Sequence, residues 1–258
     1  MDKNELIKQW EAEENHAFQG WDFSHISNRW HSPNPPWDYA SIVKSYLKES
    51  DTLLDMGTGG GEVLLSINHP HKNTYATEAY EPNFELCKKT LSPLGITVAR
   101  TYTDENFNSD DKIPFDDQFF NVVINRHDSF DLAEVDRVLK PGGYFITQQV
   151  GEDDCNEFAK MLNDNYVYSV PGHSLENYTD TLIGMDYDII KTDEAKYPVK
   201  FFDVGALVFY AKIIAWEFPN FSVKTHLQKL LHCHQKITDS GSLQGTGHSF
   251  YFVAKKTT

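Results

Sequence analysis

The sequence predicts an α/β fold built on a doubly wound, mostly parallel sheet. Two observations predict it. Short apolar runs alternate with helical patterns between residues 50 and 150, and a glycine-rich turn directly follows the first of these runs. Because each right-handed crossover packs its helix on one face of a parallel sheet, we expect helices on both faces. A chain of 258 residues permits one principal domain with smaller attachments.

The first 40 residues divide into a helix and an aromatic segment. Leu6 and Trp10 lie at helical spacing among charged residues, which predicts a short amphipathic helix at 4–16. The segment 18–39 is rich in aromatic residues and proline, which indicates irregular backbone. Such aromatic side chains either form a lid over a ligand pocket or wrap the domain surface, and both interpretations stay open. We therefore expect an N-terminal helix and lid at 1–40 and the main domain at 41–258.

Each element in the first part of the main domain follows from its own pattern. A helix at 38–48 leads into a strand at 52–55, the glycine-rich turn and a helix at 62–67. Pro82 suits the first turn of the next helix. Apolar runs between turn residues predict the remaining elements: strands at 74–77, 96–102, 119–125 and 144–150, helices at 82–91 and 132–139, and a turn at 141–143.

Beyond residue 151 the alternation is less regular. We expect a substrate-side insertion around 164–184 and additional helices within 204–234. Two strand candidates, 185–192 and 197–202, follow the insertion, and only one of them need join the sheet. The remaining predictions are a helix at 156–162, helices at 204–216 and 223–234, and a final strand at 249–255.

Bulk properties exclude several classes of function. The formal net charge of −15 disfavours nucleic acid as a partner, because phosphate backbones are bound through lysine and arginine. The three cysteines are far apart and lack C-x-x-C spacing, so we expect neither a disulfide framework nor a metal site. No apolar run approaches a membrane span and no targeting segment is visible, so we expect a cytoplasmic protein without membrane contact.

The glycine-rich turn indicates which cofactor is bound. It has the pattern D-x-G-x-G-x-G, formed by Asp55, Gly57, Gly59 and Gly61. A dinucleotide-binding turn would place a third glycine at position 62, where this sequence has Glu62. The two carboxylates that flank the turn would repel a pyrophosphate but attract an ammonium and a sulfonium. The turn therefore predicts a site for S-adenosylmethionine.

The chain here resembles the class I S-adenosylmethionine-dependent methyltransferases, in particular the uncharacterised bacterial group called methyltransferase type 11. Four blocks between about 50 and 151 carry the resemblance: L-L-D-M-G-T-G-G-G-E at 53–62, E-A at 78–79, I-P-F-D-D-Q-F-F-N-V-V-I-N at 113–125 and E-V-D-R-V-L-K-P-G-G-Y-F-I-T at 134–147. It implies a seven-stranded Rossmann-like sheet in the order 3-2-1-4-5-7-6, with the last strand antiparallel.

The resemblance also implies roles for individual residues. Glu78 would accept hydrogen bonds from both ribose hydroxyls, and Ala79 and Tyr80 would lie along the adenine. An acidic residue after the third strand would contact the adenine amine, and Asp104, Asp110 and Asp111 all compete for this role. The expected cofactor-binding set is Asp55, Gly57, Thr58, Gly59, Gly61, Glu78, Ala79, Tyr80 and Asn125.

The acceptor site is expected where the fourth strand ends, because ligands bind outside the carboxyl ends of the strands in such sheets. His127 is the candidate general base, although it can equally cap or pack at the strand end. Arg126 can hold an anionic acceptor or form a structural ion pair with Asp128 or Glu134. Trp37, Gln148 and Tyr210 are the candidate substrate-binding residues.

The sequence therefore predicts methyl transfer from S-adenosylmethionine to a small molecule whose identity and acceptor atom stay open. Two alternatives remain: an RNA or protein methyltransferase of the same fold, and a non-catalytic protein that binds S-adenosylmethionine. A nicotinamide enzyme is the least favoured reading. The sequence does not indicate an oligomeric state.

Overall fold

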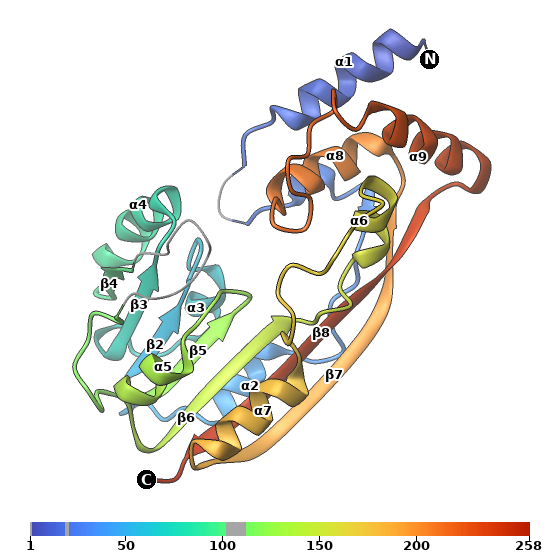
Figure 1. Cartoon of the computed structure of the whole chain (residues 1–258). Coiled ribbons are helices and arrows are strands. Elements are labelled where there is room, and N and C mark those ends of the chain that lie inside the picture. Colours follow the sequence, from blue (N-terminus) through green and yellow to red (C-terminus); the bar gives the residue numbers. More distant parts are fainter. Residues whose placement is uncertain (1, 19–20, 102–111) are drawn as a thin grey trace.

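The architecture is a single mixed sheet with helices on both faces (Figure 1). The computed structural model describes residues 2–18, 21–101 and 112–258. Within them eight strands lie in the order β1-β7-β8-β6-β5-β2-β3-β4. The strands are β1 (Trp30–His31), β2 (Leu53–Met56), β3 (Thr74–Glu78), β4 (Thr97–Arg100), β5 (Phe120–Arg126), β6 (Leu139–Val150), β7 (Tyr187–Phe201) and β8 (Leu243–Lys256).

The predicted sheet order is confirmed. Strands β4, β3, β2, β5 and β6 are parallel neighbours, and β8 lies antiparallel between β6 and β7. This is the order 3-2-1-4-5-7-6 with an antiparallel last strand. The two-residue strand β1 is an addition that the sequence did not predict, and it pairs with the end of β7.

The structure corrects two strand predictions. The two candidates at 185–192 and 197–202 are parts of one continuous strand, β7. Pro198 is tolerated there because β1 covers β7 only at Lys200 and Phe201, so the strand is a sheet edge along most of its length. Strand β6 begins at Leu139, and the predicted turn at 141–143 is taken up as an irregularity in its pairing with β5.

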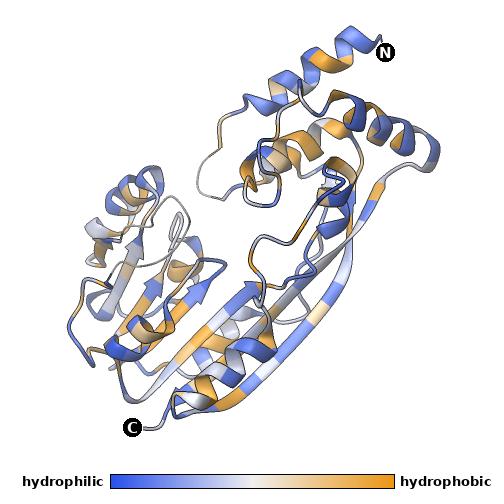
Figure 2. Cartoon of the chain, in the orientation of Figure 1, coloured by the Kyte–Doolittle hydropathy of each residue, from blue (hydrophilic) through white to orange (hydrophobic). Residues whose placement is uncertain are grey.

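Alternate residues of the strands face two different helical layers. On β2, Leu53 packs toward α2 (Tyr39–Ser45), α3 (Glu62–Ile67) and α4 (Glu81–Thr90). Its neighbour Leu54 packs toward α5 (Leu132–Val138) and α7 (Leu175–Gly184). Both leucines are fully buried. Burial on both faces explains the apolar middle of β5, residues 122–124, which Figure 2 colours orange.

A separate helical cap lies beyond the carboxyl end of β6. It consists of α1 (Lys3–Glu14), α6 (Asn156–Leu162), α8 (Val204–Ile213) and α9 (Leu227–Ser240), which share one hydrophobic cluster with the end of β7 and the start of β8. Figure 1 shows the long strands β7 and β8 running from the sheet to this cap. None of the helices in the described residues is long and apolar enough to cross a membrane.

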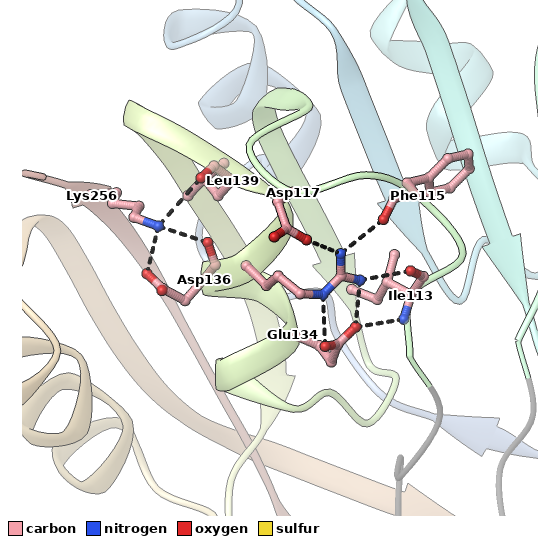
Figure 3. A network of polar contacts seen from close by, with 8 residues as sticks. Ile113, Phe115, Asp117, Glu134, Asp136, Leu139 and Lys256 are labelled. Carbon is pink, nitrogen blue, oxygen red and sulfur yellow. Dashed lines mark hydrogen bonds and ion pairs between the residues drawn. The ribbon is translucent and has the colours of Figure 1, made fainter.

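One arginine joins the loop before β5 to helix α5. The guanidinium of Arg137 donates to both carboxylate oxygens of Glu134 at 2.7–2.8 Å and to the carbonyl oxygens of Ile113 and Phe115. Asp117 accepts a further bond from it at 2.8 Å. Figure 3 shows these partners gathered around one point. The Arg137 guanidinium holds the pKa of Glu134 below its usual range, which shows that the ion pair favours the charged carboxylate.

Substituting Arg137→Met should lower the free energy of unfolding by about 2–3 kcal/mol, since it leaves a largely buried carboxylate and two carbonyls without their donor. The melting temperature should fall by roughly 5–10 °C. Lys196→Met is the control, because Lys196 forms a single exposed ion pair with Asp153. It should change stability by less than about 1 kcal/mol. Equal losses in the two variants would contradict this role of Arg137.

Candidate functional site

The glycine-rich turn lies between β2 and α3 and depends on left-handed backbone conformations. Gly57, Gly59 and Gly61 have φ angles of 63°, 62° and 87°. A Cβ atom on Gly57 would lie 2.1 Å from a carboxylate oxygen of Asp128, and one on Gly61 would lie 2.8 Å from the side chain of Leu91. Both glycines are therefore required by conformation and by space.

The carboxylate of Glu78 holds this turn from the end of β3. Its Oε2 accepts from the backbone N–H of Gly59 at 2.9 Å. Its Oε1 accepts from the backbone N–H groups of Ala79 and Tyr80 at 3.0 and 2.9 Å. Burial raises the pKa of Glu78, whereas these hydrogen bonds oppose the rise. The side chain of Asn83 donates a fourth hydrogen bond to Glu78, so a ligand hydroxyl would have to share the carboxylate with these donors or replace Asn83.

Two further carboxyl groups lie around the turn. Burial raises the pKa of Asp55 to about 7, and the negative charges of Glu78 and Asp128 add to the rise. Burial and the negative charge of Glu78 likewise raise the pKa of Asp128 to about 7. Since folding raises both values, these groups cost stability as the pH rises toward and beyond 7. A cation bound among them would relieve that cost.

A buried polar cluster lies next to the turn on β5 and β6. Asn125 is fully buried and neighbours Met56 of β2 in the sheet. Its Oδ1 accepts from Gln149 Nε2 at 2.6 Å and faces Thr147 Oγ1 at 3.4 Å. Its Nδ2 has no hydrogen-bond partner among the described residues. A fully buried amide donor without a partner is costly, so it marks a position where a ligand oxygen would be favourable.

The structure brings Trp37, Gln148 and His127 together in one chain of hydrogen bonds. The indole Nε1 of Trp37 donates to Gln148 Oε1 at 2.8 Å, and Gln148 Nε2 lies 2.9 Å from His127 Nε2. The ring of His127 is exposed to solvent. Desolvation by the surrounding protein and the positive charge of Arg126 lower the pKa of His127. Because the ring also contacts water, this lowering is limited.

Other predicted residues lie apart from this chain. Arg126 is exposed at the end of β5 and forms no ion pair within the described residues, whereas Glu134 pairs with Arg137. Tyr210 is buried in the cap, where it packs against Phe201 and Phe218. Tyr80 is 55% exposed. The three competing aspartates, Asp104, Asp110 and Asp111, lie outside the described residues.

The aromatic N-terminal segment reaches the glycine-rich turn through Trp21. A Cβ atom on Gly59 would lie 3.9 Å from Cδ1 of Trp21. The other side of Trp21 contacts the cap, with ring centroids 5.7 Å from Phe18 and 6.0 Å from Trp216. Half of the Trp21 surface is exposed. This side chain therefore bridges the cap and the turn.

Sequence reasoning missed three residues of the site. Asp128 was considered only as an ion-pair partner, and its position against Gly57 has no signal in the sequence. Cys87 Sγ donates to the carbonyl of Gly59 at 2.7 Å, whereas the sequence shows Cys87 only as one of three cysteines without disulfide or metal spacing. Trp21 belonged to the predicted aromatic segment, but nothing in the pattern distinguished it from the other aromatics. Within the described residues, no group of His, Cys, Asp and Glu is arranged to hold a metal ion.

The segment that contains this turn is similar in sequence to known methyltransferases. Residues 54–147 match the family described as "Methyltransferase domain" (Methyltransf_11). A phthiotriol/phenolphthiotriol dimycocerosates methyltransferase from Mycobacterium tuberculosis is 35% identical over 94 residues, which are 34% of this chain and 32% of that protein. Ribosomal RNA small subunit methyltransferase G from Lachnoclostridium phytofermentans is 30% identical over 154 residues, or 54% of this chain and 63% of that protein. The matches thus span about a third to two thirds of these relatives.

Solved structures share the fold at low sequence identity. A protein from Bacillus halodurans, provisionally named a methyltransferase, has a TM-score of 0.53 at 16% identity and covers 86% of this chain and 99% of its own. A protein of unknown function from Deinococcus radiodurans has a TM-score of 0.56 at 10% identity, over 87% and 89% of the two chains. The matched segment and the sheet order lead to one conclusion: residues 54–147 of this chain match a methyltransferase domain, within a Rossmann-like fold.

Proposed function

We propose that this protein transfers a methyl group from S-adenosylmethionine to a small-molecule acceptor. The observation that carries the proposal is the set of three carboxyl groups, Asp55, Glu78 and Asp128, around the glycine-rich turn. An anionic cofactor would be repelled here. A nucleoside that carries an ammonium and a sulfonium would neutralise these charges.

The residues present fit this cofactor at several points. Glu78 would accept from the ribose hydroxyls by sharing or replacing the side-chain hydrogen bond of Asn83, while its three backbone donors keep the carboxylate in place. Asn125 Nδ2 supplies a buried donor that lacks a partner within the described residues. Gly57 and Gly61 give the turn its left-handed conformation and leave space for the side chains of Asp128 and Leu91. Thr58 belongs to the same turn.

When bound, this cofactor supplies an electrophilic methyl carbon attached to a sulfonium. Charge is dispersed rather than created as such a methyl group is transferred, so the protein contributes mainly by aligning the acceptor and excluding water. Arg126 and His127 lie at the end of β5 beside the turn and would contact the acceptor. Trp37 and Gln148 would support them, and Tyr210 would act only through the packing of the cap.

The N-terminal segment 1–40 would act as a lid. Trp21 lies over Gly59 and contacts Phe18 and Trp216 of the cap side. A half-exposed indole at this point offers a flat apolar surface to a ligand in the turn. Its position therefore favours the lid interpretation over simple wrapping of the surface.

A second candidate function is methylation of RNA, because a ribosomal RNA methyltransferase is among the relatives. The net charge of −15 opposes this candidate. Filter binding at two salt concentrations distinguishes the RNA acceptor from the small-molecule acceptor. RNA binding would weaken steeply with salt, whereas binding of a small molecule would not.

Glu78→Gln should weaken the binding of S-adenosylmethionine at least tenfold, because hydrogen bonds to a charged group contribute about 1.5–3 kcal/mol. Isothermal titration calorimetry measures the change. Glu85→Gln, an exposed position on α4, is the matched control and should bind like the parent. Parent-like affinity of the Glu78 variant would contradict the assigned role.

Binding should tighten as the pH rises from 6 to about 7.5. The raised pKa values of Asp55 and Asp128 mean that both carboxyl groups hold protons below pH 7 and must release them to meet a cation. The dissociation constant should fall by roughly an order of magnitude, with proton release visible by calorimetry in buffers of different ionisation enthalpy. Asp128→Asn should reduce the slope, and the exposed Asp188→Asn should not. A slope of opposite sign would refute this account of the acidic site.

Saturation with S-adenosylmethionine should change the intrinsic tryptophan fluorescence, and Trp21→Phe should remove most of that change. Trp21 is expected to report binding because its ring lies next to Gly59. Trp30→Phe, inside the cap, should retain the parent response. If both variants respond like the parent, Trp21 does not cover the cofactor.

A further inference from the structure

We infer that Trp37, acting through Gln148, fixes His127 as a hydrogen-bond donor from Nδ1 and thereby prevents it from serving as a general base. The inference deepens the proposed function and rests on it for the presence of a methyl acceptor. Trp37 and Gln148 are positioning residues in this scheme. Their effect on the histidine ring is independent of any ligand.

The first step is the orientation of the Gln148 amide. An indole N–H can only donate, so the atom of Gln148 that lies 2.8 Å from Trp37 Nε1 must be the carbonyl oxygen. The amide nitrogen then faces His127 Nε2 at 2.9 Å. The amide is 3% exposed and Trp37 packs against Tyr251 with ring centroids 5.0 Å apart, so both partners are held in place.

The second step is the state of the imidazole ring. An amide N–H₂ can only donate, so Nε2 of His127 must present its lone pair. In a neutral ring the proton then resides on Nδ1. A doubly protonated ring would place the Nε2–H of His127 against the amide N–H of Gln148, and two donors repel each other. Rotating the amide to offer its oxygen to His127 would break the bond from Trp37. The network therefore opposes both the other tautomer and the imidazolium.

The third step concerns what Nδ1–H can reach. Among residues 2–18, 21–101 and 112–258, Nδ1 of His127 has no hydrogen-bond partner, and the side chain is exposed. Arg126, also exposed, is its neighbour in sequence at the end of β5. An exposed Nδ1–H donor without a partner among the described residues favours an acceptor molecule that presents a carbonyl or anionic oxygen to His127. Its reacting atom must arrive with a free lone pair, and no proton passes to His127.

Nuclear magnetic resonance of the full chain labelled with ¹⁵N-histidine tests the inference without cofactor or substrate. The His127→Asn variant identifies the signals of His127. In the parent near neutral pH we expect Nδ1 to carry the proton and Nε2 to be unprotonated. In Gln148→Glu the new carboxylate should accept hydrogen bonds from Trp37 Nε1 and from His127, so the proton of His127 should move to Nε2.

Trp37→Phe keeps the ring that packs on Tyr251 but removes the indole donor, and it should produce a mixture of the two tautomers. Trp30→Phe is the matched control, since the buried Trp30 Nε1 has no partner within the described residues and its removal breaks no hydrogen bond. It should retain the parent pattern. A parent ring protonated at Nε2, or an unchanged tautomer in Trp37→Phe, would overturn the inference. Failure to bind S-adenosylmethionine would instead count against the proposed function, because the tautomer is measured without it.

Discussion

The carboxylate of Glu78 connects the end of β3 to the glycine-rich turn that follows β2. Three backbone N–H groups converge on it, from Gly59, Ala79 and Tyr80. These bonds fix the turn while keeping a negative charge inside the site. The neighbouring Asp55 and Asp128 add to that charge, and their raised pKa values show that the folded chain holds it at a cost. The proposed preference for a cationic ligand rests on this contact and on the carboxyl groups around it.

Much of the sheet could be predicted from the sequence because its signals are local. Apolar runs, turn residues and the spacing of helices determine a parallel sheet and its crossovers. The continuous strand β7 was not predictable in the same way. Pro198 and the charged residues interrupt its apolar pattern, so the sequence indicates two short strands instead of one long edge strand. The short strand β1 exists only because the end of β7 offers a partner, which is a tertiary effect.

The residues of the candidate site likewise fall into those with a local sequence pattern and those brought together only by the fold. The residues of the turn and Glu78 form a local pattern, so the sequence could place them. The chain from Trp37 through Gln148 to His127 joins residues 111 and 21 positions apart, and no local pattern reports it. The sequence suggested His127 as a base because of its ordinary pKa, whereas the hydrogen-bond pattern favours a donor. Tyr210 is a candidate substrate-binding residue from the sequence, but its ring lies in the core of the cap.

A crystal structure with S-adenosylhomocysteine tests the central claim most directly. The account predicts that the ribose lies on Glu78, that the amino-acid part lies along Gly57 to Gly61 near Asp55 and Asp128, and that Trp21 covers the ligand. A ligand bound elsewhere, or bound in the turn without contact to Glu78, would contradict it.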